Sequence, residues 1–297
     1  MTALEPAPSS TAPSAPPSNA SIRRTQRAGR VMAFVVALVV TLFFAFPLYW
    51  MVITALKGDA EVFQSPPTFV PHPAVWSNFL TSLSQIPFWS YVRNSLLYAI
   101  LSAIGAALSA SIVAYGFSKV KWPGREAVFF LVLITMLLPY QVTMIPTYLI
   151  FRSIGWTGTL LPLIVPAFLG NAYFIFLMRQ FIRTLPDELA DAARIDGCTE
   201  FRVFWTIIVP LIKPALAVVF LNQFLNAWKD FLGPLLYLND PSQYTLSLGL
   251  QQFQSANGQE WALLMACATV FTVPLFVLFF FTQRYFVEGV TFTGLKG

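Results

Sequence analysis

Long apolar runs alternate with short polar segments along almost the whole chain. The runs expected to be helical cover residues 31–55, 91–117, 127–150, 160–181, 215–238 and 261–283. Each has about 20 or more residues, which is the length that crosses the hydrocarbon core of a bilayer as an α-helix. Prolines and a glycine inside the third and fourth runs are tolerated in spans and often mark kinks. The pattern predicts an all-α integral membrane protein with six transmembrane helices in one domain, residues 31–297.

Composition supports this class and excludes an ordinary soluble domain. Of the 297 residues, 57% are hydrophobic and only 10% are charged. The first residues are rich in Pro, Ser and Ala and lead into the arginines of segment 23–30. Such a segment has too little apolar surface to fold, so we expect residues 1–30 to form a disordered basic tail. The first apolar run is too long for a signal-peptide core and should stay attached as a span.

The basic residues predict the orientation of the chain. They gather in segments 23–30, 119–125 and 179–213, whereas the loops expected on the opposite side hold few of them. Lys and Arg concentrate in cytoplasmic loops of membrane proteins. We therefore predict a multi-pass membrane protein, surrounded by lipid, with both termini and segment 183–213 in the cytoplasm.

A polar island, residues 186–210, interrupts the apolar pattern. Leu189, Ala192 and Ala193 share a helical face, and Gly197 is suited to the left-handed conformation that ends a helix. Thr199 is suited to cap a second helix, whose expected apolar stripe comprises Phe201, Phe204, Trp205 and Ile208. The island is predicted to be two short helices joined at a glycine. The alternative is a solvated loop between spans.

The island resembles the cytoplasmic coupling signature of bacterial ATP-binding-cassette (ABC) importer permeases. That signature is Glu-Ala-Ala, three residues, Gly, nine residues, Ile, one residue and Leu-Pro. Asp191, Ala192, Ala193, Gly197, Ile207 and Pro210 stand at these spacings, with Asp191 in place of the glutamate and Val209 in place of the leucine. The resemblance implies contact with an ATPase through Glu188, Asp191, Ala192, Ala193, Asp196, Gly197 and Pro210.

Segments 93–97, 137–149 and 226–253 are similar to the carbohydrate-importer permeases, in particular the maltose-permease second-subunit type. The similarity covers roughly residues 31–297 and implies the importer-type permease fold and a place in the bacterial cytoplasmic (inner) membrane. It also implies a heterodimer with a second permease subunit, two ATPase subunits that use ATP and Mg, and an extracytoplasmic solute-binding protein. The sequence has no phosphate-binding glycine–lysine loop, so we expect this chain to bind no cofactor itself.

The fifth apolar run contains ionisable groups at membrane depth. Asn222, Asn226, Trp228, Lys229 and Asp230 are expected to line the substrate path, because charged groups inside a membrane usually face a bundle interior or a watery cavity. Members of the resembling family often have asparagine where Lys229 stands. The alternative, of nearly equal weight, is an internal ion pair with amides that join helices.

Rival functions fit less well. A membrane-embedded enzyme needs clustered nucleophiles, bases or metal ligands, but the only histidine, His72, lies between two prolines. We therefore expect no catalytic residue, no metal site and no nucleic-acid partner. Inverted repeats or several paired charges inside the membrane would favour a stand-alone secondary transporter, but the sequence shows no clear repeat and only one charge pair. Within the importer class, the solute is expected to be a sugar or oligosaccharide, or else a polyol or sugar phosphate.

Overall fold

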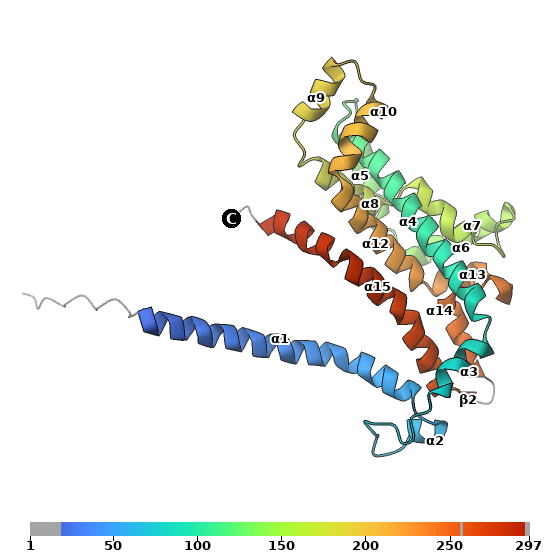
Figure 1. Cartoon of the computed structure of the whole chain (residues 1–297). Helices are drawn as coiled ribbons and strands as arrows, with labels where there is room; N and C mark the ends of the chain where they lie inside the picture. The colour runs from blue at the N-terminus through green and yellow to red at the C-terminus, as the bar shows by residue number, and fades with distance from the viewer. Residues whose placement is uncertain (1–18, 256–257, 295–297) are drawn as a thin grey trace, which may run out of the picture. The chain divides into compact units, whose positions relative to one another are not determined.

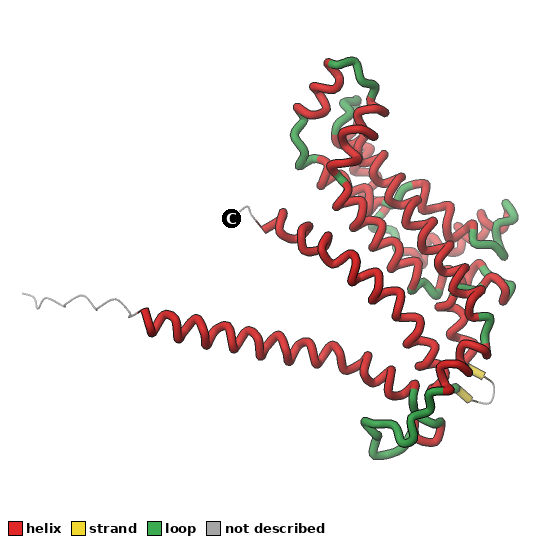
Figure 2. Tube along the Cα trace, in the orientation of Figure 1, coloured by secondary structure: helices red, strands yellow, loops and turns green. Residues whose placement is uncertain are grey.

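The structure, a computed structural model, describes residues 19–255 and 258–294, and side chains within 29–253 and 260–280. Helices make up most of the described chain (Figure 2). Two short antiparallel strands, β1 Gln254–Ser255 and β2 Gly258–Gln259, are the strands found in that part. The chain divides into two units, residues 1–51 and 52–297, which are described separately.

The first unit carries most of helix α1, Asn19–Ala55. Its stretch Gly29–Ala55 is long and apolar enough to cross a membrane. The helix begins at Asn19, so part of the tail predicted to be disordered over residues 1–30 is helical instead. The arginines there are good helix formers, and they extend the apolar helix backwards. Residues 1–18 of the expected tail lie outside the described residues.

The second unit begins within the end of α1 and contains the remaining elements. Its helices include short 3₁₀ segments (η1, η3 and η4) and one π-helical turn (η2). In chain order they are α2 Asp59–Val62, α3 Ser77–Gln85, α4 Phe88–Ser118, α5 Arg125–Thr135, α6 Tyr140–Ser153, α7 Leu161–Ile164, η1 Val165–Leu169, α8 Ala172–Ile182, α9 Glu188–Ile195, α10 Glu200–Val203, η2 Phe204–Ile208, α11 Val209–Leu211, α12 Lys213–Trp228, α13 Leu232–Tyr237, η3 Pro241–Gln243, α14 Leu246–Gly249, η4 Leu250–Phe253 and α15 Trp261–Gly294.

Four stretches of the described chain are long and apolar enough to span a membrane, and up to six if each of two bent pairs counts as one span. The third expected run, 127–150, is not one continuous helix, because α5 and α6 meet at 95°. Pro139 at the junction is extended, and a proline disfavours helix in the residue before it.

The fifth expected run, 215–238, is also broken. Within it, α12 ends at Trp228 and α13 begins only at Leu232. Before the run, the segment Glu200–Leu211 meets α12 at 80°. The prediction of an unbroken helix over 215–238 is therefore wrong. The break coincides with Lys229 and Asp230, the two charged residues of this run.

Helix α4 lies at the centre of the second unit, packed along α8 and α12 (Figure 1). Ser102, Ala106, Ala110 and Ala114 repeat every four residues along it, and all four are buried. Small side chains allow close approach between helices in lipid, where packing drives association. This small-residue face is therefore used for packing inside the fold.

The core around α4 also includes the polar island. Ala190 and Ala193 of α9, with Val203 and Phe204 beyond the turn, belong to the same hydrophobic cluster as residues of α4, α8 and α12. The island is therefore a packed extension of the helical core and not a solvated loop.

Gly105 of α4 gives a matched test of this close packing. A Cβ at Gly105 would lie 2.5 Å from the Phe168 ring, whereas one at Gly116 on the same helix would meet nothing within 4 Å. We expect Gly105→Ala to destabilise the fold by about 1–3 kcal/mol through overpacking. Gly116→Ala should leave stability unchanged or raise it, since alanine is the better helix former. Thermal unfolding of the purified protein in detergent checks this, and equal melting temperatures for the two variants would contradict it.

Candidate functional site

The polar island forms a compact helix–turn–helix, here called the α9–α10 unit (residues 187–211). Gly197 ends α9 with φ of +79°, in the left-handed region. The N–H of Gly197 donates to the carbonyl of Arg194, and the N–H of Cys198 donates to that of Ala193, both at 3.0 Å. These two bonds satisfy carbonyls that the helix end leaves free, which is the Schellman arrangement. The predicted role of Gly197 as the helix-ending residue is confirmed.

Thr199 begins the second helix as predicted. Its hydroxyl accepts a hydrogen bond from the N–H of Arg202 at 3.4 Å. The chain then continues through η2 and α11 to Ile212, where α12 starts in a new direction. The turn at Gly197 and the cap at Thr199 therefore fix the orientation of the two helices relative to each other.

The expected apolar stripe of the second helix is divided between the core and the surface. Phe204 and Ile208 are buried, whereas Phe201 is 74% exposed and Trp205 is partly exposed. On α9, Ala193 is buried together with Ala190, which the prediction missed. The prediction of a single apolar face is therefore wrong. The inner side chains complete the core around α4, whereas the outer ones remain at the surface.

What the unit presents outward is a second set of apolar side chains. Ile195 is 86% exposed, and Leu189 on the same helix is also exposed. Phe201 and Trp205 contact each other edge to face with ring centroids 6.0 Å apart. These exposed apolar side chains make the outer face of the unit a candidate interaction surface.

Arg194 fastens the two helices to each other and to α4. Its Nε donates to Glu200 Oε1 at 2.7 Å, its Nη1 donates to Asp191 Oδ1 at 2.7 Å, and its Nη2 donates to the Lys119 carbonyl at 3.1 Å. The Glu200 hydrogen bond raises the pKa of the Arg194 guanidinium further above its ordinary value. Tyr115 of α4 donates its hydroxyl to Glu200 Oε2 at 2.5 Å. Three charged groups and a phenol thus tie the α9–α10 unit to the end of α4.

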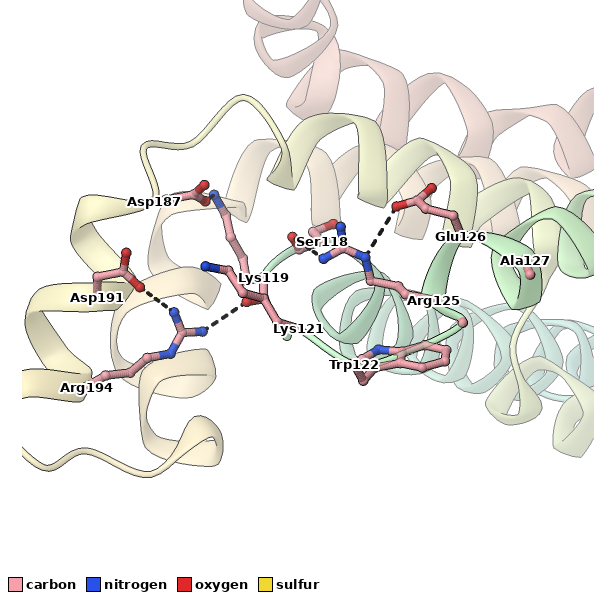
Figure 3. A pocket seen from close by; sticks show the side chains of 11 residues that line it. Ser118, Lys119, Lys121, Trp122, Arg125, Glu126, Ala127, Asp187, Asp191 and Arg194 are labelled. Atoms are coloured by element: carbon pink, nitrogen blue, oxygen red, sulfur yellow. Dashed lines mark hydrogen bonds and ion pairs between the residues drawn. The ribbon is translucent and has the colours of Figure 1, made fainter.

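A second tie runs through Lys119, whose side chain is only 3% exposed. Its ammonium donates to Asp187 Oδ1 at 2.5 Å and to the Leu185 carbonyl at 2.6 Å. The hydrogen bond to Lys119 and its charge hold the pKa of the Asp187 carboxyl below its ordinary value. Figure 3 shows these groups around a cleft of about 520 Å³ between the α4–α5 turn and α9.

The same end of the bundle has a third ionic contact. The buried Arg179 of α8 donates through Nη2 to both carboxylate oxygens of Glu126, at 2.6 and 2.7 Å. Its guanidinium lies 3.9 Å from the centre of the Phe129 ring. This contact holds α5 against α8 beside the α9–α10 unit.

The structure therefore gathers some of the expected coupling residues and leaves others apart. Asp191 pairs with Arg194, while Glu188, Ala192, Asp196 and Pro210 are exposed. The sequence reading missed the roles of Tyr115, Lys119 and Glu200. In the sequence, the charges at 119–125 indicate only the orientation of the chain, and nothing in their spacing connects them to Glu200.

The second group of expected residues lies where α12 ends. Asn226 and Lys229 are exposed, and Asn222 is half-buried with its amide donating to the Val218 carbonyl at 3.0 Å. Asp230 Oδ2 accepts from the Tyr98 hydroxyl at 2.9 Å, and Oδ1 accepts from the Gly233 N–H at 3.1 Å. Among the described residues, no ion pair joins Lys229 to Asp230, so the internal pair considered from the sequence is not formed.

Trp228 has a packing role in this structure. It is 1% exposed, its ring stacks between Phe224 and Phe271, and its Nε1 donates to the Phe271 carbonyl at 3.2 Å. Its ring is therefore not accessible to a solute in this conformation. Of the five residues expected to line a path, Asn226 and Lys229 are the exposed ones.

Comparison with known proteins agrees with this architecture. Residues 103–292 match the family model described as "Binding-protein-dependent transport system inner membrane component". The arabinooligosaccharides transport system permease protein AraQ of Halalkalibacterium halodurans is 33% identical over 85% of this chain and 91% of its own length. The sn-glycerol-3-phosphate transport system permease protein UgpE of Yersinia pestis is 32% identical over 88% of this chain and 95% of its own. The diacetylchitobiose uptake system permease protein DasC of Streptomyces coelicolor is 30% identical over 91% and 98%.

Solved structures show the same fold. A bacterial ABC transporter involved in the import of the acidic polysaccharide alginate aligns with a TM-score of 0.77 at 22% identity, over 89% of this chain and 98% of that one. The alginate ABC transporter in complex with an alginate pentasaccharide-bound periplasmic protein aligns with a TM-score of 0.64 at 15% identity, over 88% and 95%. The chain belongs to the family of inner-membrane components of binding-protein-dependent transport systems.

Proposed function

We propose that this permease forms half of the translocation pore of an ABC importer, and that the α9–α10 unit is its ATPase-docking element. The observation that carries the proposal is the unit itself. Its inner side chains and charges are fastened to α4, and its outer side exposes Ile195 and Phe201. A short helix with exposed apolar anchors fits the mode in which a helix lies in a groove of its partner.

The solute class is inferred from the relatives. The permeases compared above are named for arabinooligosaccharides, diacetylchitobiose and sn-glycerol-3-phosphate, and the structural neighbour is an importer of alginate. These names support a sugar or oligosaccharide, with a polyol or sugar phosphate as the alternative. They span neutral and anionic solutes, so they leave the charge of the solute open.

The partners follow from the same comparison. We propose a second permease subunit, two ATPase subunits that use ATP and Mg, and a solute-binding protein outside the membrane. The neighbouring alginate transporter is described in complex with a periplasmic protein, which supports the last of these. A stand-alone transporter remains the rival, and uptake by this purified subunit without nucleotide would favour it.

The proposed topology has six spans with both termini in the cytoplasm. Besides α1, α4, α7–α8 and α15, the bent pair of α5 with α6 counts as one span, and α12, which follows the α9–α10 unit after an 80° bend, begins another. The basic segments 119–125 and 179–213 support a cytoplasmic α9–α10 unit.

In the proposed mechanism, the partner ATPase closes around ATP and carries the docked α9–α10 unit with it. The ties through Arg194 and Lys119 pass this displacement to α4, and the membrane helices move as rigid bodies between inward- and outward-facing states. ATP biases this equilibrium only by its different affinity for the two states.

Gly197→Val tests the turn. A Cβ there meets nothing within 4 Å, so the substitution acts only through the positive φ. A β-branched residue in this region is strained by about 1–3 kcal/mol, which should displace the two helices and uncouple ATP hydrolysis from uptake. Gly197→Asn, which tolerates this conformation, should retain most uptake. ATPase activity and uptake are measured in proteoliposomes, and wild-type uptake by Gly197→Val would refute the role of the turn.

Phe201→Ser together with Ile195→Ser tests docking. Both side chains are exposed, so the protein should fold, while loss of apolar anchors should weaken ATPase binding about tenfold or more. The control is Leu80→Ser on α3, where an apolar side chain is 75% exposed. Co-purification of the ATPase at the wild-type ratio in the double variant would exclude these side chains as anchors.

Glu200→Ala tests the tie to α4 separately from docking. It removes the acceptor shared by Arg194 and Tyr115 but leaves the exposed apolar side chains in place. We expect the ATPase to remain bound while uptake per ATP hydrolysed falls about tenfold, because hydrogen bonds to charged groups contribute about 1.5–3 kcal/mol each. Tyr115→Phe, which removes one hydroxyl, should have a smaller effect. Loss of ATPase binding in Glu200→Ala would place Glu200 in the docking surface instead.

A further inference from the structure

In the proposed topology, the helix break after Trp228 falls within the fifth expected apolar run, residues 215–238. Helix α12 has 16 residues, which gives a length of about 24 Å, less than the roughly 30 Å hydrocarbon thickness. Non-helical backbone at this depth is tolerated only where it is buried in protein or lines a water-filled cavity. The break at residues 229–231 must therefore be covered by protein on one side and, where it is open, face water or a partner.

On the covered side of the break, the polar groups of Asp230 have hydrogen-bond partners within the protein. The backbone carbonyl of Asp230 accepts from the Ser247 hydroxyl at 2.5 Å. The Asp230 carboxylate is held by the Tyr98 hydroxyl and the Gly233 N–H. The negative charge of Asp230 is thus directed toward α4 and α13, and its two oxygens already have donors.

The open side carries a cation. Lys229 is exposed, and within the described part of the chain no carboxylate pairs with it. The carboxyl end of α12 favours a positive charge there. An ammonium is not stable against hydrocarbon, so this face of the break borders water or a partner and not lipid tails.

A neutral polar group accompanies this cation on the same face of α12. Asn226 precedes Lys229 by three residues, which places the two side chains on one helical face, and it is exposed as well. An amide and an ammonium together offer donors for hydroxyl groups and for a negatively charged oxygen. An anion that carries hydroxyl groups matches this pair of side chains better than a neutral sugar does.

We propose that Lys229 is a specificity-determining residue that selects anionic carbohydrates, either uronic-acid sugars or sugar phosphates, through a charge-assisted hydrogen bond to the carboxylate or phosphate. The inference rests on the proposed function and narrows its solute class. Its physical basis is that the charge of Lys229 is not neutralised by Asp230, so a solute anion supplies the compensation during passage. Two other outcomes are possible: a carboxylate of the partner permease pairs with Lys229, or Lys229 extends to the membrane surface without touching solute.

The test uses the complete complex with its binding protein in proteoliposomes. ATP-driven uptake of digalacturonate, glucose 6-phosphate and neutral cellobiose is compared in wild type, Lys229→Gln, Lys229→Arg and Lys213→Gln. Lys213 is the matched control, because it is an exposed lysine at the other end of α12. The expected result is uptake of at least one anionic probe by wild type, with kcat/KM for that probe lowered about tenfold or more in Lys229→Gln. Lys229→Arg should retain most of it, Lys213→Gln should match wild type, and any uptake of cellobiose should not fall in Lys229→Gln.

Several results would overturn the inference and leave the proposed function in place. These are ATP-driven uptake of cellobiose alone, an equal loss for anionic and neutral probes in Lys229→Gln, or no change in that variant. Dissociation of the second permease subunit from the Lys229→Gln complex on size exclusion would assign Lys229 to the subunit interface. Uptake of none of the three probes by wild type would overturn the carbohydrate assignment itself, and this inference with it.

Discussion

The charged contacts between the end of α4 and the α9–α10 unit are the constraint on which the functional architecture depends. Apolar packing alone is non-directional, so helices that touch only through Ala and Val side chains have many arrangements of similar energy. Arg194 removes this freedom, because its planar guanidinium reaches Glu200, Asp191 and the Lys119 carbonyl in fixed directions. The buried ammonium of Lys119 adds a second fixed point at Asp187. A partner that moves this unit therefore moves α4 with it.

Local features of this unit were predictable because they depend on neighbouring residues alone. Gly197 and Thr199 act within a few positions of themselves, through a left-handed turn and a helix cap. The apolar runs were equally predictable, since the hydropathy of a run depends only on the residues within that segment. The break between α5 and α6 had a local signal in Pro139, but the sequence does not give the 95° angle, which depends on what each half packs against.

The division of the apolar stripe was not predictable for the same reason. Phe201 and Phe204 are the same residue type three positions apart, yet one is exposed and the other is buried beside Tyr115, with ring centroids 5.3 Å apart. Only the position of α4 distinguishes them. The substrate-path residues show the same limit, because Trp228 is buried by Phe271 and Asp230 is held by Tyr98, both far away in the sequence. The sequence identifies the polar groups near the end of α12, but it does not show which side of the helix break each of them faces.

Helix α4 connects the two candidate sites physically. Near one end, Tyr115 donates to Glu200 of the α9–α10 unit, and nearer the other, Tyr98 donates to Asp230 at the helix break. With a rise of roughly 1.5 Å per residue, these two tyrosines are about 25 Å apart along one uninterrupted helix. The helix between them is packed through buried small residues against α8 and α12, which restricts bending. A displacement imposed at Glu200 therefore reaches the break through a rigid element and two hydrogen bonds to carboxylates.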